Sequence, residues 1–324
     1  MTQGTSASPP RPDKISIAIS SCLLGERVRF DGNHQQDAFI TGTLGLVFDF
    51  VPVCPEVAIG MGVPRPPIRL TGDPQSPRAV GVKDVSLDVT AALTAYGRRM
   101  AVELDGISGY IFKGKSPSCG TRRVKVYSGG APSMQGVGVY AREIIQRQPL
   151  LPVEEEGRLG DPVLRENFIA RVFAYRRWQS LLASGFSVGK LVEFHTVHKL
   201  SLMAHGSEYY RALGRLVAEA KSHRPGVLCE RYGAEFMAAL QRPATRKRHT
   251  NVLLHIMGYL KTRLDRADKA ELLELIEAYR LGRLPLIVPI TLLKHYFRRF
   301  PDEYIVKQSY LHPHPAELML RNGI

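Results

Sequence analysis

The sequence of 324 residues predicts an α/β domain followed by an all-α domain. Three observations predict this fold class. Up to about residue 150, short apolar runs alternate with Gly and Pro, which is typical of strands joined by loops. Further on, apolar residues recur at helical spacing, as with Phe168, Val172 and Trp178. Between the two patterns, residues 151–162 combine proline with an acidic cluster, which predicts an interdomain linker.

Within the first domain, residues 15–150, three apolar runs predict buried strands: Ile15–Ser20, Leu46–Val53 and Gly109–Phe112. Val89–Leu104 predicts a helix that crosses between two of them. Strands joined by crossover helices form a Rossmann-like open sheet, so this is the architecture that we expect. Residues 1–14, rich in Ser, Pro and Thr, are expected to be a disordered tail.

Residues 163–324 are predicted to be all helical. Ser187 and Ser207 stand where helix N-caps are expected, and Ala267–Leu281 is dense in the strong helix formers Ala, Leu and Glu.

The net charge of +14 implies an anionic partner such as nucleic acid or a membrane surface. From Glu156 onward there are 27 Lys and Arg against 16 Asp and Glu, so most of the excess lies in the helical domain. Basic runs are often only solvated faces, but contacts to phosphate supply most of nonspecific nucleic-acid affinity. We therefore expect an RNA-binding domain. The residues expected to contact RNA are Lys199, Arg246, Lys247, Arg248, Lys261, Arg263, Arg266, Arg298 and Arg299.

No apolar run reaches the roughly 20 residues that span a bilayer. The longest, Leu284–Leu293, is interrupted by two prolines, and the amino terminus lacks the apolar core of a secretory signal. We therefore expect no membrane association and a cytoplasmic protein. No sequence feature indicates an obligate protein partner.

Three of the four cysteines, Cys22, Cys54 and Cys119, each follow a predicted strand. The carboxyl ends of strands in an open α/β sheet lie at the edge where ligands bind, so these cysteines can converge on one point. Polar loop residues surround each of them, which a cysteine buried in the core does not need. The sequence therefore favours shared metal ligation over three packed core thiols, the simpler alternative. Zinc with Cys229 or a histidine as a fourth ligand stays open, although the spacing matches no compact zinc pattern.

The motifs around these cysteines resemble those of TudS-type thiouracil desulfidases. The motifs are Cys22-Leu23-Leu24-Gly25, Cys54-Pro55-Glu56 and Lys113-Gly114-Lys115-Ser116-Pro117-Ser118-Cys119-Gly120. In the second domain, His195-Thr196-Val197-His198-Lys199-Leu200 and His314-Pro315-Ala316-Glu317-Leu318 are similar to a helical companion domain. The fused form resembles the tRNA 4-thiouridine desulfidases.

This resemblance implies a [4Fe–4S] cluster held by Cys22, Cys54 and Cys119, with one iron open to the sulfur of a thiocarbonyl. A thiophilic iron polarises C=S as a Lewis acid, so water can attack the ring carbon while sulfur departs without net redox change. The partner it implies is thiolated tRNA, with 4-thiouridine converted to uridine.

Such a reaction needs a group that moves the proton of the water and groups that hold the ring. We expect Glu56, two residues from Cys54, to be the general acid/base. Ser116 and Ser118 are expected to position the base or the water, although each serves equally well as a turn former. Lys113 and Lys115 are expected to neutralise phosphate or developing charge. Ser21, Arg29 and Asp31 are weaker candidates for substrate binding, the last two also as a structural ion pair.

Two other functions stay open. One is desulfuration of free thiobases or thionucleosides, and the other is a metal-bearing RNA-binding regulator without turnover. His195, His198 and His205 allow a second metal site, although interior histidines or phosphate contacts explain them better.

Overall fold

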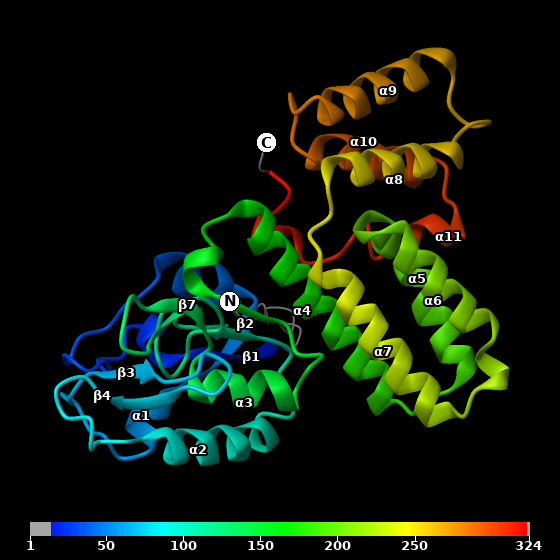
Figure 1. The fold of residues 1–324 in the computed structure, drawn as a ribbon. Coiled ribbons are helices and arrows are strands. Elements are labelled where there is room, and N and C mark those ends of the chain that lie inside the picture. The colour runs from blue at the N-terminus through cyan, green and yellow to red at the C-terminus, as the bar shows by residue number, and fades with distance from the viewer. Residues whose placement is uncertain (1–13, 323–324) are drawn as a thin grey trace, which may run out of the picture.

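A computed structural model describes residues 14–322, so the predicted tail lies outside the described residues except for Lys14. The predicted fold class is confirmed. An α/β region with two sheets is followed by a mostly helical region (Figure 1). Among the described residues, no helix has the length and apolar character needed to cross a bilayer.

The first sheet contains the three predicted strands. It has the order β2 (Phe48–Val53), β1 (Ile15–Ser20), β5 (Tyr110–Phe112) and β8 (Val153–Glu155), and all of its pairs are parallel. Because parallel sheets are covered on both faces, their central strands are apolar throughout. Ile17, Ala18 and Ile19 in β1 are accordingly all fully buried.

The second sheet was not predicted. It has the order β4 (Arg78–Gly81), β3 (Ile68–Thr71), β6 (Val124–Tyr127) and β7 (Ser133–Gly136) and mixes parallel with antiparallel pairs. Each of these strands has only four residues, and most carry exposed positions. Segments this short and polar lack the apolar run that marks a buried strand.

Two helices lie against the sheets. α2 (Thr90–Glu103) forms where the crossing helix was predicted, and it packs on α3 (Val139–Arg147). The two helices approach so closely that a Cβ at Gly97 would lie 2.7 Å from the Cβ of Glu143. Shorter turns complete the region: η1 (Ser21–Leu24), η2 (Phe39–Thr43), η3 (Leu44–Leu46), α1 (Pro55–Ala58) and η4 (Glu156–Arg158).

The second region is helical, as predicted. Its helices are α4 (Pro162–Ala183), α5 (Val188–His205), α6 (Ser207–Ala218), α7 (Pro225–Gln241), α8 (Arg246–Gly258), α9 (Arg266–Arg280), α10 (Ile287–Arg299) and α11 (Glu303–Val306), with short 3-10 turns η5 (Ala220–Ser222) and η6 (Ala316–Leu318). Ser187 caps α5 through its side chain. The prediction for Ser207 was wrong: the preceding helix ends only one residue before α6, so Gly206 takes the N-cap position.

Helix α4 joins the two regions (Figure 1). Its first half contributes Phe168 and Val172 to the apolar cluster that contains Ile17 and Ile19 of β1. Its second half contributes Trp178 to the core of the helical region. The helix therefore belongs to both cores.

Residues 151–162, predicted to be an interdomain linker, contain a strand. This strand, β8, extends the parallel sheet by pairing with β5. Of the acidic residues in this segment, Glu154 and Glu155 are buried, and Glu155 and Glu156 accept hydrogen bonds from the loop that carries Cys119. The boundary between the two domains stays a prediction.

Candidate iron–sulfur site

The three predicted cysteines lie at the carboxyl edge of the parallel sheet. Cys22 lies in η1 directly after β1, and Cys54 follows β2 and precedes α1. Cys119 ends a loop that leaves β5. Because β2, β1 and β5 are adjacent and parallel, their carboxyl ends bring the three thiols to one place.

All three thiols line one cavity of about 330 Å³. Glu56, Lys113 and Ser116 line the same cavity. The structure therefore brings together the three cysteines and most of the residues that the sequence predicts beside them.

Burial raises the pKa values of all three thiols. Burial, and after it the nearby Cys54, raises the pKa of the Cys22 thiol to about 11. Burial also raises the pKa of Cys54. Burial, followed by the charges of Glu56 and Cys54, holds the pKa of Cys119 well above its ordinary value. Three thiolates this close are stable only if a cationic group offsets their desolvation and mutual repulsion.

Glu56 is held in place by two donors. Arg65 donates from Nε to Oε2 at 2.7 Å, and Ser118 donates from Oγ to Oε1 at 2.8 Å. The Arg65 side chain is only 3% exposed, so this ion pair is largely shielded from water. A carboxylate has about four acceptor sites, so Glu56 can still accept a hydrogen bond from a water in the cavity.

Arg65 was not predicted as a site residue. It lies nine positions after Glu56 in the proline-rich run Val63-Pro64-Arg65-Pro66-Pro67, and nothing in that spacing points to the carboxylate. The signal that could have found it is physical: an arginine between prolines in a short loop needs a partner if the loop is buried.

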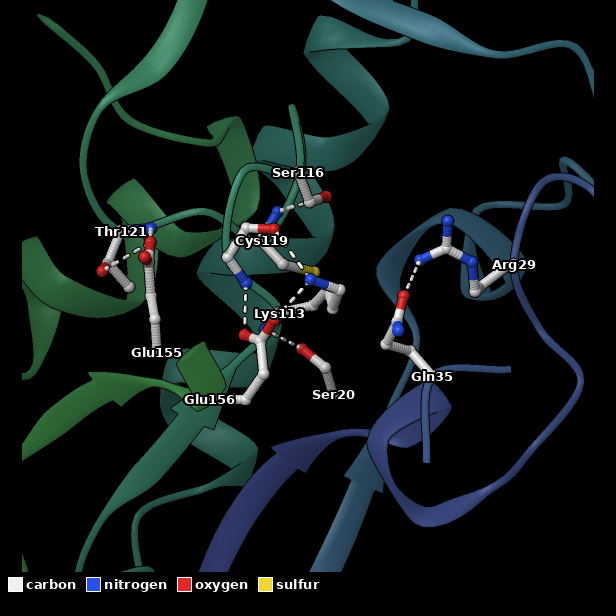
Figure 2. A network of polar contacts seen from close by, with 10 residues as sticks. Ser20, Arg29, Gln35, Lys113, Ser116, Cys119, Thr121, Glu155 and Glu156 are labelled. Carbon is white, nitrogen blue, oxygen red and sulfur yellow. Dashed lines mark hydrogen bonds and ion pairs between the residues drawn. The ribbon is translucent and has the colours of Figure 1, made fainter. Parts of the chain in front are cut away.

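The loop that carries Cys119 is anchored by the acidic residues of the predicted linker (Figure 2). Glu155 accepts hydrogen bonds at Oε1 from the backbone N–H groups of Thr121 and Arg122, at 2.7 and 3.2 Å. Glu156 pairs with the Lys113 ammonium and accepts the backbone N–H of Gly114 at 2.6 Å. These anchors were not predicted, because the acidic run was interpreted as part of an interdomain linker.

The other residues predicted near the cysteines differ in their hydrogen bonds and in their exposure. Ser116 Oγ accepts the backbone N–H groups of Ser118 and Cys119 at 3.2 and 3.1 Å, which is the turn-forming role. Lys115 is exposed at the cavity, with a left-handed backbone φ of 61°. Ser21 and Arg29 line the cavity.

Asp31 does not reach the cavity lining. Its Oδ1 accepts the backbone N–H of Asn33 at 3.1 Å and lies 3.7 Å from Arg29 Nε. The hydrogen bonds from Asn33 lower its pKa. Its surroundings match the structural ion pair rather than a direct contact with substrate.

The donor set fits an iron–sulfur cluster. The cavity presents three soft thiols, and the hydroxyl of Ser21 beside Cys22 is buried in it without a hydrogen-bond partner. Among residues 14–322, no group of three or more His, Cys, Asp or Glu side chains is arranged to hold a single metal ion. The ligands of one zinc ion must lie within about 2.0–2.3 Å of a common point, whereas the thiolates of a cluster bind separate irons.

The residues predicted to bind RNA occupy several places on the helical region. Arg246, Lys247 and Arg248 begin α8, whereas Lys261, Arg263 and Arg266 follow its far end. A helix of that length separates the two groups by about 20 Å. Lys199 is half-buried on α5, and Arg298 and Arg299 are exposed at the end of α10. These residues do not form one compact patch.

The three histidines predicted as a possible second metal site, His195, His198 and His205, are interior residues. His195 Nδ1 bonds the hydroxyl of Tyr232, and His198 and His205 bond the carbonyl oxygens of Phe194 and Arg242. Burial lowers the pKa of His195 to about 4, of His198 to about 3 and of His205 to about 4. Cys229, the fourth cysteine, lies half-buried on α7.

Comparison with known proteins found a matching family for each of the two regions of the chain. Residues 17–156 match the family described as 2-thiouracil desulfurase, and residues 199–315 match a family described as a protein of unknown function (DUF1722). The uncharacterized protein YbgA of Escherichia coli (strain K12) is 32% identical over 159 residues, which are 49% of this chain and 94% of that protein. A solved structure described as the [4Fe–4S]-dependent thiouracil desulfidase TudS is 30% identical, with 46% of this chain and 95% of that chain covered and a TM-score of 0.36.

Proposed function

This chain belongs to the family of the Escherichia coli protein YbgA and carries a 2-thiouracil desulfurase domain, and on that premise we propose that it removes sulfur from a thiolated uracil base without net redox change. The observation that carries the proposal is the cavity at the sheet edge, where three thiols lie beside an oriented carboxylate.

In this proposal Cys22, Cys54 and Cys119 hold a [4Fe–4S] cluster, and no fourth protein thiol completes the set. Bound there, the cluster supplies a thiophilic Lewis acid that polarises the thiocarbonyl bond. The remaining steps belong to side chains of this chain.

Glu56 takes a proton from the attacking water. Ser118 and Arg65 each occupy one of its carboxylate oxygens, so the carboxylate cannot rotate away from the cavity. Such pre-orientation lowers the barrier because the base needs no rearrangement when the proton moves. Lys115, exposed at the cavity, is placed to meet the phosphate of a nucleotide substrate.

The substrate that we propose is 4-thiouridine in tRNA. The support is the charge distribution, because the helical region carries most of the net positive charge while the cysteine cavity lies in the other region. Free thiobases or thionucleosides are the alternative substrates, and an RNA-binding regulator without turnover is the alternative function.

A salt titration tests the tRNA substrate. If phosphate contacts deliver the RNA, kcat/KM for thiolated tRNA should fall steeply with salt, with a log–log slope of about −0.7 to −0.9 per phosphate contacted. Turnover of 2-thiouracil by the same preparation should barely change. Sulfide release measured anaerobically follows both reactions.

A pair of double variants localises the contacts. Lys261→Gln with Arg263→Gln should weaken tRNA turnover and reduce the salt slope, because both side chains are exposed beside α9. Lys83→Gln with Lys125→Gln removes the same charge from the first region and is the control. Equal salt dependence for tRNA and 2-thiouracil would refute the tRNA substrate, and binding of tRNA without any sulfide release would favour the regulator.

A further inference from the structure

A second and larger cavity lies in the helical region, apart from the cysteines. It has a volume of about 640 Å³ and is lined by residues of α4, α5, α8 and the carboxyl-terminal segment 310–322. None of the three cysteines of the first site lines it.

Five arginines line this cavity: Arg165, Arg171, Arg177, Arg246 and Arg321. Among the side chains that the structure describes, those of residues 14–316 and 318–322, two carboxylates line the cavity, and both are engaged. Asp161 caps the first turn of α4, and Glu166 pairs with Arg321 at 2.8 Å. Among those described side chains, no ion pair involves Arg165, Arg171, Arg177 or Arg246. The described lining therefore carries an excess of positive charge. Glu154, whose charge acts on Arg171 from outside the lining, pairs with Arg158 at 2.6 Å.

Arg171 is the most buried of these five arginines. Its residue surface is 8% exposed, and its Nε is buried without a hydrogen-bond partner. Burial lowers the pKa of its guanidinium to about 10. Arg165 lies about one and a half helical turns earlier on α4. Its Nε is also buried without a hydrogen-bond partner among the described residues. Buried guanidinium groups are retained at a cost unless an anion meets them.

His198 adds a hydrogen-bond acceptor to the arginine donors of the cavity. Its Nδ1–H donates to the carbonyl oxygen of Phe194 at 2.8 Å, so Nε2 of the neutral ring is an acceptor. That Nε2 is buried without a partner, and His198 lines the cavity. A ligand that fits this site therefore carries a hydroxyl or N–H donor as well as an anionic group.

The rest of the lining fits an organic ligand rather than a bare ion. The rings of Tyr279 and Tyr310 and apolar side chains such as Leu286 complete the wall. Arg246 lies over the Tyr279 ring at 5.8 Å, and Arg321 lies over the Tyr310 ring at 5.1 Å. The volume falls in the range of about 300–1,000 Å³ that is typical of small-molecule sites.

We propose that this cavity binds a phosphorylated ligand of nucleotide size, with the phosphate at Arg171 and Arg165 and a hydroxyl or amino group at His198. The site is independent of the proposed desulfuration, because it shares no residue with the cysteine cavity. The phosphate can come from a free nucleotide or from the RNA itself.

Calorimetric titration of the full chain with adenosine 5′-monophosphate tests the site, because a purine nucleotide is not a product of the proposed reaction. The nucleotide should bind saturably, and adenosine, which lacks the phosphate, should bind at least about tenfold more weakly. Arg171→Met should weaken nucleotide binding by about tenfold or more. Arg176→Met is the matched control, since Arg176 is exposed on the same helix and does not line the cavity.

Arg165→Met provides a second variant if Arg171→Met fails to fold, and circular dichroism checks both. Displacement of the nucleotide by unmodified tRNA would identify RNA as the source of the phosphate, and its absence would identify a free nucleotide; both results support the site. Equal affinity for adenosine and its monophosphate, no saturable binding, or unchanged affinity in the folded arginine variants would overturn it.

Discussion

At the scale of single residues, the orientation of Glu56 depends on two side chains from other parts of the chain, Arg65 and Ser118. Glu56 could be predicted because it stands two positions from Cys54, so the strand end places both at one edge. Arg65 reaches the carboxylate through the path of a loop, which depends on tertiary structure. The sequence also left the roles of Ser116 and Ser118 undecided, whereas the structure gives the first to a turn and the second to Glu56.

Replacing Glu56 by glutamine tests its role. Gln keeps an oxygen that accepts from Ser118 but cannot take a proton, so kcat should fall by about 10²–10⁴-fold while the visible spectrum of the cluster is unchanged. The change also leaves the buried Arg65 without its counterion, so the melting temperature should fall.

The double variant Glu56→Gln with Arg65→Gln separates the two effects. It should recover stability, because no buried cation is left unpaired, but it should not recover turnover. Full sulfide release by Glu56→Gln with an intact cluster would remove the proposed role of this carboxylate.

At the scale of elements, strand β8 and the loop that carries Cys119 form one unit. The carboxylate of Glu155, at the end of β8, accepts three hydrogen bonds from Thr121 and Arg122. A Cβ at Gly120 would lie 2.9 Å from the carbonyl oxygen of Ser116, so the loop is also tightly closed on itself. The edge strand thus fixes the position of the third thiol.

Truncation of Glu155 to alanine tests this anchor. It leaves the backbone N–H and the hydroxyl of the buried Thr121 without their acceptor, so the free energy of unfolding should fall by about 1–3 kcal/mol. Iron should also dissociate faster on dilution. Glu103→Ala is the control: Glu103 is exposed on α2 and pairs only with Arg99, a surface pair of small value. Identical denaturation midpoints for both variants would contradict the anchoring role.

At the scale of the whole molecule, the fold class and the first strands of the parallel sheet could be predicted from the sequence. A long apolar run is buried as a strand largely independently of the segments that pack on it. β1 was predicted with its observed limits, since every residue from Ile17 to Ser20 is buried. The second sheet and β8 escaped prediction because their partners, rather than their own residues, make them strands. The sharing of α4 between two cores could not be predicted either, because apolar spacing along a helix does not say which neighbours cover each stretch.

The central claim is that Cys22, Cys54 and Cys119 together hold an iron–sulfur cluster. Its most direct test is the iron content and visible spectrum of the anaerobically reconstituted chain, compared with those of four cysteine-to-alanine variants. The native chain and Cys229→Ala should be brown with about four irons per chain, and Cys22→Ala, Cys54→Ala and Cys119→Ala should lose both iron and sulfide release. A folded, active native chain without iron, or a Cys119→Ala variant that keeps its iron while Cys229→Ala loses it, would contradict the claim.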